Sequence, residues 1–176
     1  MWFLSLPVSF VLVSITLPFV RRLSHKFGLY DEPEGDSLKV HSKPTPFTGG
    51  IAIFLGTLTS SIIFMVLVFS RSPLAFGVGV GGFSVFALGL WDDLYWKSSD
   101  DYRPNVKFAA QVSISLLASL VLVLTGTWIR FFPNVLVGWL VGGFYVFGGI
   151  NALNMQDGID GLAGGLVALT GLGFFI

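Results

Sequence analysis

The sequence predicts an all-α fold, a polytopic transmembrane helix bundle with five full spans and a truncated sixth. Only 11% of the 176 residues are charged and 53% are hydrophobic, whereas soluble domains usually carry about 25% charged residues. The apolar residues also form uncharged runs, most of which reach the roughly 20 residues that a helix needs to cross a bilayer. We therefore expect a single integral membrane domain over residues 1–176.

Six uncharged runs locate the expected helices. They occupy residues 1–20, 44–70, 72–91, 108–129, 131–156 and 161–176. The predicted spans are 2–20, 47–70, 73–91, 107–126, 134–154 and 162–176. The first run has no basic residue before it and no small-residue cleavage site, which indicates a retained helix and not a signal peptide. The last run, at 16 residues, is too short to cross, so we expect part of a longer membrane protein; a re-entrant or interfacial helix is the alternative.

The charged residues indicate one functional face. If every full span crosses the membrane, the segments after the first, third and fifth runs share one side and contain eight of the ten Lys and Arg residues. The positive-inside rule makes that side cytoplasmic. All ten Asp and Glu residues fall on the same side, and none lies in the middle of a run. This pattern argues against an ion pathway through the bilayer and favours a site at the cytoplasmic membrane interface.

The first cytoplasmic segment, DEPEGDSLKVHSKPTPFTGG (31–50), contains candidate anion-binding residues. Its prolines and glycines exclude a continuous helix. Lys39, His41 and Lys43 alternate with small polar residues, which suits contacts with phosphate or carboxylate groups. The closing Gly-Gly pair would let a ligand approach the next helix, whose N-terminal dipole favours anions. The alternative is a solvated loop whose basic residues set the topology or contact anionic lipids.

The second segment begins with Asp92 and Asp93, directly after an apolar run. Carboxylates at a helix C-terminus oppose the helix dipole, which disfavours a merely solvated helix end. Adjacent helical residues point in different directions, so one carboxylate can face a metal or phosphate while the other holds a lysine, a water or the nucleophile. Asp100 and Asp101 lie in the turn-forming stretch KSSDDYRPN, and we interpret that second pair as structural.

The third segment, NALNMQDGIDGLAGG (151–165), predicts a cluster of oxygen ligands. Asn151 and Asn154 lie three residues apart on an otherwise apolar helix, and Asp157 and Asp160 continue the spacing. Mg²⁺ takes oxygen ligands, usually one or two carboxylates together with substrate phosphates. In a soluble protein the D-G-x-D-G stretch would fit a pair of turns equally well. Carboxamides inside a span are costly unless they are bonded, which favours a ligand site.

Together, three stretches resemble the successive cytoplasmic motifs of a known family. HSKPTPFTGG, GLWDDLYW with the following VKFAAQ, and NALNMQDGIDGLAGG are similar to those of the polyprenyl-phosphate N-acetylhexosamine-1-phosphate transferases, glycosyltransferase family 4. The resemblance covers nearly the whole chain. The UDP-N-acetylglucosamine type is the closer match, because phospho-N-acetylmuramoyl-pentapeptide transferases show PTMGG and NLTDGLDGLA where this chain has PTPFTGG and NMQDGIDGLA.

The resemblance implies a specific reaction. A sugar 1-phosphate, N-acetylglucosamine 1-phosphate above all, passes from a UDP-sugar to undecaprenyl phosphate with release of UMP. This would be the first membrane step in the synthesis of a cell-envelope polysaccharide such as O-antigen or a teichoic acid linkage unit. The expected location is the bacterial inner (plasma) membrane, with Mg²⁺ as cofactor and Mn²⁺ as an alternative. Expected partners are the two substrates and the lipid bilayer, with a homodimer as one assembly considered and no nucleic acid.

The resemblance also implies roles for individual residues. Asp92 is expected to orient or deprotonate the lipid phosphate, with Asp93 in support. Asn154 and Asp160 are the expected metal ligands. The expected nucleotide-sugar site contains Lys43, Thr45, Asn151 and Asp157, and the expected lipid-phosphate site contains Arg103 and Lys107.

Several alternative classes compete with this interpretation. A phospho-N-acetylmuramoyl-pentapeptide transferase of peptidoglycan synthesis is the nearest. A CDP-alcohol phosphatidyltransferase would need D-G-x-x-A-R, whereas the D-G at 157–158 is followed by IDGL. A transporter or non-catalytic scaffold would be expected to show polar residues near the midplane or paired broken helices. Family members are longer and carry a later metal-ligating Asp and a His-rich loop, so we expect the 176-residue chain alone to be inactive.

Overall fold

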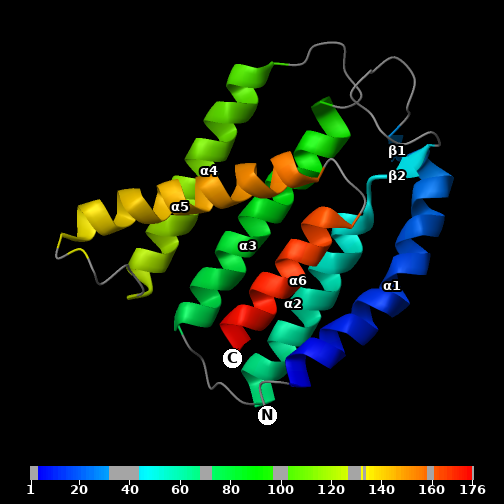
Figure 1. The fold of residues 1–176 in the computed structure, drawn as a ribbon, viewed down its shortest axis with the longest axis horizontal. Coiled ribbons are helices and arrows are strands. Elements are labelled where there is room, and N and C mark those ends of the chain that lie inside the picture. The colour runs from blue at the N-terminus through cyan, green and yellow to red at the C-terminus, as the bar shows by residue number, and fades with distance from the viewer. Residues whose placement is uncertain are drawn as a thin grey trace.

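The computed structural model describes residues 4–31, 44–67, 73–96, 103–126, 132, 134–157 and 161–175, and it is built mainly of helices (Figure 1). The helices are α1 (Ser5–Phe27), α2 (Gly49–Leu67), α3 (Pro73–Trp91), α4 (Pro104–Leu124), α5 (Val135–Gln156) and α6 (Leu162–Phe175). Five of them are long and apolar enough to cross a membrane, whereas α6 is shorter. The predicted all-α polytopic fold is confirmed.

The first helix is longer than the span predicted over residues 2–20. α1 continues past Arg21 and Arg22 to Phe27. Basic side chains allow this because their long stems reach the membrane surface while the backbone stays helical. The helix ends at Gly28, whose φ of 65° is a left-handed conformation that glycine adopts without strain.

A short antiparallel ladder connects α1 to the start of α2. β1 (Tyr30–Asp31) pairs with β2 (Thr45–Pro46), with Tyr30 opposite Pro46 and Asp31 opposite Thr45. The ladder was not predicted, since the prolines and glycines of segment 31–50 indicated a loop. It holds the end of α1 beside the beginning of α2 (Figure 1).

Small residues allow α1 and α2 to pack closely. A Cβ added to Gly56 would collide with the backbone and side chain of α1. Ser60 Oγ donates to the carbonyl oxygen of Ser5 at 3.0 Å. At the opposite end of the pair, the buried hydroxyls of Ser24 and Thr48 are hydrogen-bonded to each other. Lipid provides no hydrophobic drive between helices, so close packing and interhelical hydrogen bonds hold such pairs together.

The same principle joins α4 and α5. A Cβ at Gly142 would lie 2.5 Å from Ser119 Oγ, and one at Gly143 would lie 2.6 Å from the Leu116 side chain. Ser119 Oγ donates to the Trp139 carbonyl oxygen, and Trp139 Nε1 donates to the Leu116 carbonyl oxygen, both at 2.8 Å. α5 is therefore anchored on α4, which it crosses obliquely (Figure 1).

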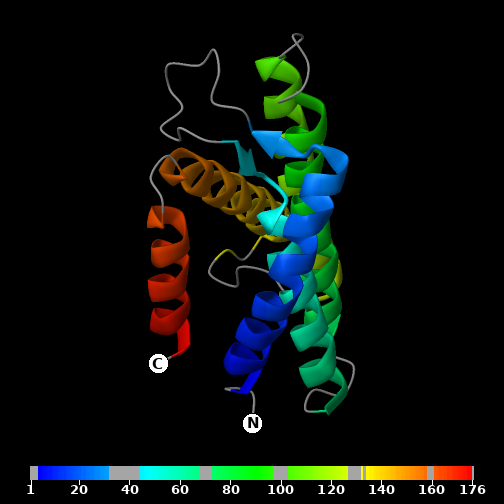
Figure 2. The ribbon, with the colours of Figure 1, turned by 90° about the vertical axis from the view of Figure 1, so that its right-hand side faces the viewer.

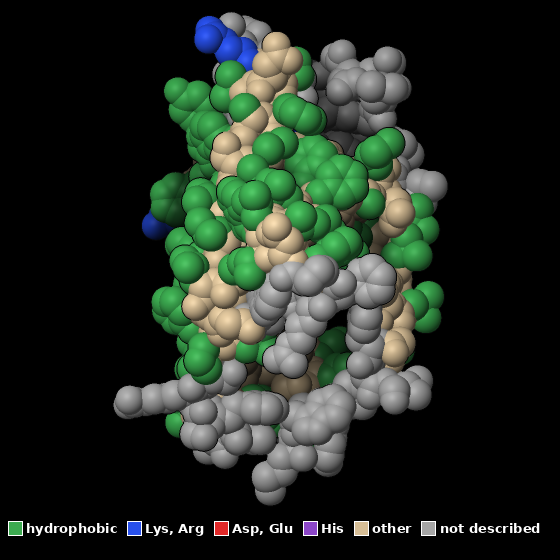
Figure 3. All heavy atoms as spheres, turned by 90° about the vertical axis from the view of Figure 1, so that its left-hand side faces the viewer, with side chains coloured by type: hydrophobic (Ala, Val, Ile, Leu, Met, Phe, Trp, Pro, Cys, Tyr) green, Lys and Arg blue, Asp and Glu red, His purple; other side chains and the backbone are tan. Residues whose placement is uncertain are grey.

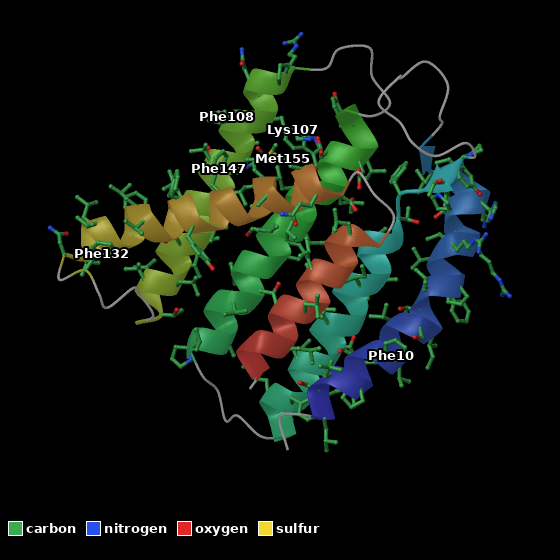
Figure 4. The ribbon with its side chains drawn as sticks, viewed as in Figure 1. Phe10, Lys107, Phe108, Phe132, Phe147 and Met155 are labelled. Carbon is green, nitrogen blue, oxygen red and sulfur yellow. The ribbon has the colours of Figure 1, made fainter. Side chains whose placement is uncertain are left out.

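The outer surface is apolar, as a membrane requires. Four of the described hydrophobic residues are buried, whereas Phe10, Phe144 and Tyr145 each expose more than 70% of their surface. Hydrophobic side chains dominate the described part of the face in Figure 3, and Phe10 lies on the outer α1 helix in Figure 4. Such a surface would aggregate in water but suits hydrocarbon. The protein is a multi-pass membrane protein.

The short helix α6 stands apart from the others. Figure 2 shows it separated from the α1 and α2 pair, with its first turn next to the last turn of α5. Its packing partner among the described elements is chiefly α5. The candidate site lies between α6 and the helices α3, α4 and α5.

Candidate active site

Asp92 and Asp93 begin a π-helical turn, η2 (Asp92–Trp96), that continues α3. The sequence predicted that the helix ends at Trp91. The structure shows instead that helical geometry continues through the two acids to Trp96. Both side chains are partly buried. π-Helical turns are rare and occur frequently at functional sites, where they change the direction of particular side chains.

Asp92 forms an ion pair with Lys107 in the first turn of α4. Lys107 Nζ donates to Asp92 Oδ2 at 2.6 Å, and the exposed fractions of the two side chains are 20% and 22%. Figure 4 shows Lys107 between α4 and the end of α3. A charge-assisted bond of this kind holds both groups in place. An ammonium has three N–H donors and a carboxylate two oxygens, so each group retains capacity for a ligand.

A cavity of about 760 Å³ lies beside this ion pair. Its polar lining residues are Asp92, Lys107, Gln111, Asn154 and Asp157. They come from the end of α3, the first two turns of α4 and the end of α5, so they gather at one end of the bundle. Cavities that bind small ligands commonly measure about 300 to 1,000 Å³, so this one is large enough.

The remaining lining of the cavity is apolar or glycine. The residues are Ile53, Val85, Leu88, Gly89, Ile150, Leu153, Ala163, Gly164, Val167 and Ala168. On α3 the lining runs from Val85 towards Asp92, so the apolar part continues from the charged end along the helices. A cavity with these two parts suits an amphiphilic ligand with an anionic head and a hydrocarbon chain.

The structure brings four of the predicted site residues to this cavity. Asp92 enters from η2, Lys107 from α4, Asn154 from the last turn of α5 and Asp157 from the C-cap position of α5. Along the chain, α4 and most of α5 lie between Asp92 and Asn154. Their convergence is the strongest structural support for a common site.

Three other predicted residues lie at the same end of the bundle but do not line the cavity. Asp93 is partly buried in η2. Arg103 is exposed at the N-cap position of α4, and Thr45 is exposed in β2.

Asn151 is also outside the cavity lining. Its Nδ2 donates to the carbonyl oxygen of Phe147 at 2.9 Å, within α5 itself. This bond satisfies one N–H donor of the carboxamide within the helix, which is a structural reason for an asparagine here. Lys43 and Asp160 lie outside the described residues.

The donor chemistry of the cavity fits a hard cation. Asn154, Asp157 and Asp92 offer the oxygen atoms that Mg²⁺ prefers. Among the residues that the structure describes, no three His, Cys, Asp or Glu side chains form a complete metal cluster. Asp160, the other predicted ligand, lies outside the described residues, so the metal site stays a prediction.

Gln111 was not predicted as a site residue. It lines the cavity and is only 6% exposed. It lies four residues after Lys107, and residues with this spacing share one face of a helix. That spacing was visible in the stretch VKFAAQ, but its meaning depends on a cavity that only the packed helices create.

Fold and site together define a polytopic membrane protein with a cavity between helices whose lining is charged at one end and apolar elsewhere. The sequence model described as glycosyl transferase family 4 matches residues 75–176, which contribute every lining residue of the cavity except Ile53. The chain belongs to this family.

Individual relatives support the same assignment. The chain is 33% identical over 168 residues to the probable undecaprenyl-phosphate N-acetylglucosaminyl 1-phosphate transferase of Bacillus subtilis, covering 90% of this chain and 43% of that protein. It is 32% identical over 168 residues to a phospho-N-acetylmuramoyl-pentapeptide-transferase of Picosynechococcus, covering 89% and 44% respectively. The corresponding Staphylococcus aureus transferase is 31% identical over 180 residues, covering 93% and 54%. The chain thus spans about half the length of these curated relatives. No solved structure matches it significantly.

Proposed function

We propose that the protein transfers N-acetylglucosamine 1-phosphate from a UDP-sugar to undecaprenyl phosphate and releases UMP. The observation that carries the proposal is the Asp92–Lys107 ion pair at the charged end of a cavity whose other walls are apolar. A polyprenyl phosphate needs this combination because its reactive head is anionic and its chain must stay in hydrocarbon. The name of the Bacillus subtilis relative describes this type of transfer.

The ion pair is suited to the lipid acceptor. Lys107 uses one contact to hold Asp92 and has further N–H donors for a phosphate oxygen. Asp92 then orients the lipid phosphate and accepts the proton that a phosphate monoester partly retains near neutral pH, since its second pKa is about 6. Arg103, exposed at the start of α4, adds positive charge at the entrance.

The transfer itself is a displacement at phosphorus. An oxygen of the lipid phosphate forms a bond to the sugar-bearing phosphorus of the UDP-sugar. The bond from that phosphorus to the bridging oxygen breaks, and UMP leaves with that oxygen. Phosphoryl transfer depends mostly on positioning and on neutralisation of negative charge, so the protein needs well-placed cations more than covalent chemistry.

The donor is proposed to bind at the α5 side of the site. Asn154 and Asp157 line the cavity from α5, and Asn154 with Asp160 would hold Mg²⁺, with Mn²⁺ as an alternative. When bound, this ion would neutralise charge on the diphosphate. The remaining residues proposed for the nucleotide-sugar side are Lys43, Thr45 and Asn151.

The active site is proposed to face the cytoplasm of a bacterial inner membrane. Support comes from the end of the bundle that carries the ladder, the start of α4 and the end of α5 (Figure 1). The Lys and Arg residues in the described part of the chain lie in the α1 and α4 turns towards that end, at Arg21, Arg22, Lys26, Arg103 and Lys107, and positive charge marks the cytoplasmic side.

A phospho-N-acetylmuramoyl-pentapeptide transferase is the second candidate, because the Picosynechococcus and Staphylococcus aureus relatives carry that name. The full-length protein in membranes, supplied with undecaprenyl phosphate, separates the two. We expect UMP release with UDP-N-acetylglucosamine and much less with UDP-N-acetylmuramoyl-pentapeptide. The reverse preference would establish the second candidate. UMP release with neither donor would refute both.

A further inference from the structure

We infer that Gln111 is a further binding residue for the acceptor, and that its carboxamide donates a hydrogen bond to the lipid phosphate. The inference rests on the proposed function and extends it by one contact. Gln111 lines the same cavity as Asp92 and Lys107 and is 94% removed from solvent, with 6% exposed. It is the most deeply buried polar side chain of the cavity lining.

The Gln111 carboxamide has unused hydrogen-bonding capacity. It forms no side-chain hydrogen bond with any residue in the described part of the chain. An amide carries two N–H donors and an acceptor oxygen. In the described part of the chain the Gln111 amide atoms are not among the enclosed side-chain atoms that lack a partner, so they reach the cavity. A ligand in the cavity can therefore accept a hydrogen bond from this amide.

The position of Gln111 on α4 suits a phosphate held by Lys107. The two residues are four apart, so they share one helix face and differ by about 6 Å along the axis. Lys107 is fixed at the charged end by Asp92. A phosphate bound to Lys107 can therefore direct another oxygen towards Gln111, one turn further into the helix bundle.

The surroundings of Gln111 identify the part of the ligand that it contacts. Leu88 of α3, which is buried, and Ile150 of α5 line the cavity with it. Gln111 thus marks the junction between the charged and apolar parts of the lining. In a polyprenyl phosphate this junction is the phosphate group and its ester oxygen, with the hydrocarbon chain directly beyond.

Ser115 provides a matched structural control. It follows Gln111 by one turn on the same face of α4, is fully buried, and its Oγ also has no hydrogen-bond partner in the structure described. Ser115 does not line the cavity. Replacing a buried polar group that serves only packing should leave ligand binding unchanged, as we expect for Ser115. Replacing a ligand-binding group should weaken ligand binding.

The test is a binding measurement on the full-length protein in lipid nanodiscs, with undecaprenyl phosphate and undecaprenol as the two probes. We expect Gln111→Leu to weaken binding of the phosphate about 10- to 100-fold, the range for a hydrogen bond to a charged group. Binding of undecaprenol should not change. The thermal midpoint without ligand should stay the same or rise, because an unpaired buried amide has been removed. Ser115→Ala should leave binding of both probes unchanged.

Gln111→Glu tests which hydrogen bond matters: one in which the amide N–H donates to the phosphate, or one in which the amide oxygen accepts from Lys107. A carboxylate of nearly the same shape offers only acceptors, so it should weaken phosphate binding at least as much as Gln111→Leu. Phosphate binding equal to that of the unmodified protein in either variant would overturn the inference and leave the proposed function intact. A lower midpoint with equal loss of both probes would also overturn it, because Gln111 would then be structural. If the unmodified full-length protein does not prefer the phosphate over the alcohol, the proposed function and the inference both fail.

Discussion

Lys107 at the start of α4 and Asp92 at the end of α3 are joined by a 2.6 Å ion pair. The opposite ends of the same two helices are held by packing, since a Cβ added to Gly77 would lie 2.8 Å from Thr125 Oγ1. Two contacts at opposite ends fix α3 and α4 relative to each other. The charged end of the cavity therefore has a defined geometry before a ligand arrives, which favours binding because less freedom is lost.

Removing the charge of Asp92 should impair the chemical step. We expect Asp92→Asn to lower kcat for UMP release by the full-length protein about 10²- to 10⁴-fold, the usual contribution of a positioned acid or base. Asparagine keeps the size of the side chain and an acceptor for Lys107, so the protein should still fold. Ser84→Ala is the control on the same helix, where Ser84 only donates to Val80. A rate close to that of the unmodified protein in Asp92→Asn would refute the assigned role.

Lys107 should matter more for the lipid acceptor than Arg103. Lys107 lines the cavity and is held by Asp92, whereas Arg103 is exposed at the N-cap of α4. We expect Lys107→Met to raise KM for undecaprenyl phosphate about tenfold or more, because a hydrogen bond to a charged group is lost. Arg103→Met should have a smaller effect that fades at high salt. Equal effects of the two variants in steady-state kinetics would contradict the position assigned to the phosphate.

Divalent cations should be required for turnover. We expect EDTA to abolish UMP release by the full-length protein, and added Mg²⁺ or Mn²⁺ to restore it. Asn154→Ala should raise the Mg²⁺ concentration needed for half-maximal activity about tenfold or more, as even indirect partners of a metal have effects of this size. Gln156→Ala, on the same helix but outside the cavity lining, is the control. Undiminished activity in EDTA would rule out the proposed metal site.

The contact between α4 and α5 should be sensitive to one added methyl group. Gly142→Ala places a Cβ 2.5 Å from Ser119 Oγ, which is too close, so the hydroxyl has to move away from its bond to Trp139. We expect a loss of about 1 to 3 kcal/mol of stability, seen as a lower thermal midpoint in detergent. Gly148→Ala in the same helix has open space around the new Cβ and should not lower the midpoint. A similar midpoint for both variants would show that this packing is absent in the protein.

The chain has no cysteine, so single cysteines report membrane sidedness cleanly. Tyr95 in η2 and Leu124 at the end of α4 are 64% and 76% exposed and lie at opposite ends of the bundle. We expect a membrane-impermeant maleimide to label Tyr95→Cys in inside-out vesicles and Leu124→Cys in right-side-out vesicles. The opposite pattern would place the cavity on the outer face.

The fold was predictable because bilayer thickness, more than specific packing, sets the length of each apolar helix. The helix ends were less predictable. Charged Arg21 and Arg22 indicated an end that the backbone does not make, because long side chains reach the surface from within a helix. The π-helical turn at Asp92 has no signal in composition, since it depends on how the end of α3 packs.

The candidate site was predictable to the extent that polar residues beside a membrane span require a reason. This identified Asp92, Asn154 and Asp157, and the family resemblance added Lys107; the structure brings all four to one cavity. The ion pair between Asp92 and Lys107 could not be derived, because it depends on the packing of two helices. Gln111 was missed for a related reason: its burial arises only from neighbouring helices.

The central claim is that a sugar 1-phosphate, and not the sugar alone, is transferred. It is tested most directly with UDP-N-acetylglucosamine labelled with ³²P at the phosphorus next to the sugar, undecaprenyl phosphate, and the full-length protein. The account predicts that the label enters the lipid fraction in a diphosphate and that unlabelled UMP is released in equal amount. Label that remains in released UDP, with sugar entering the lipid, would contradict it.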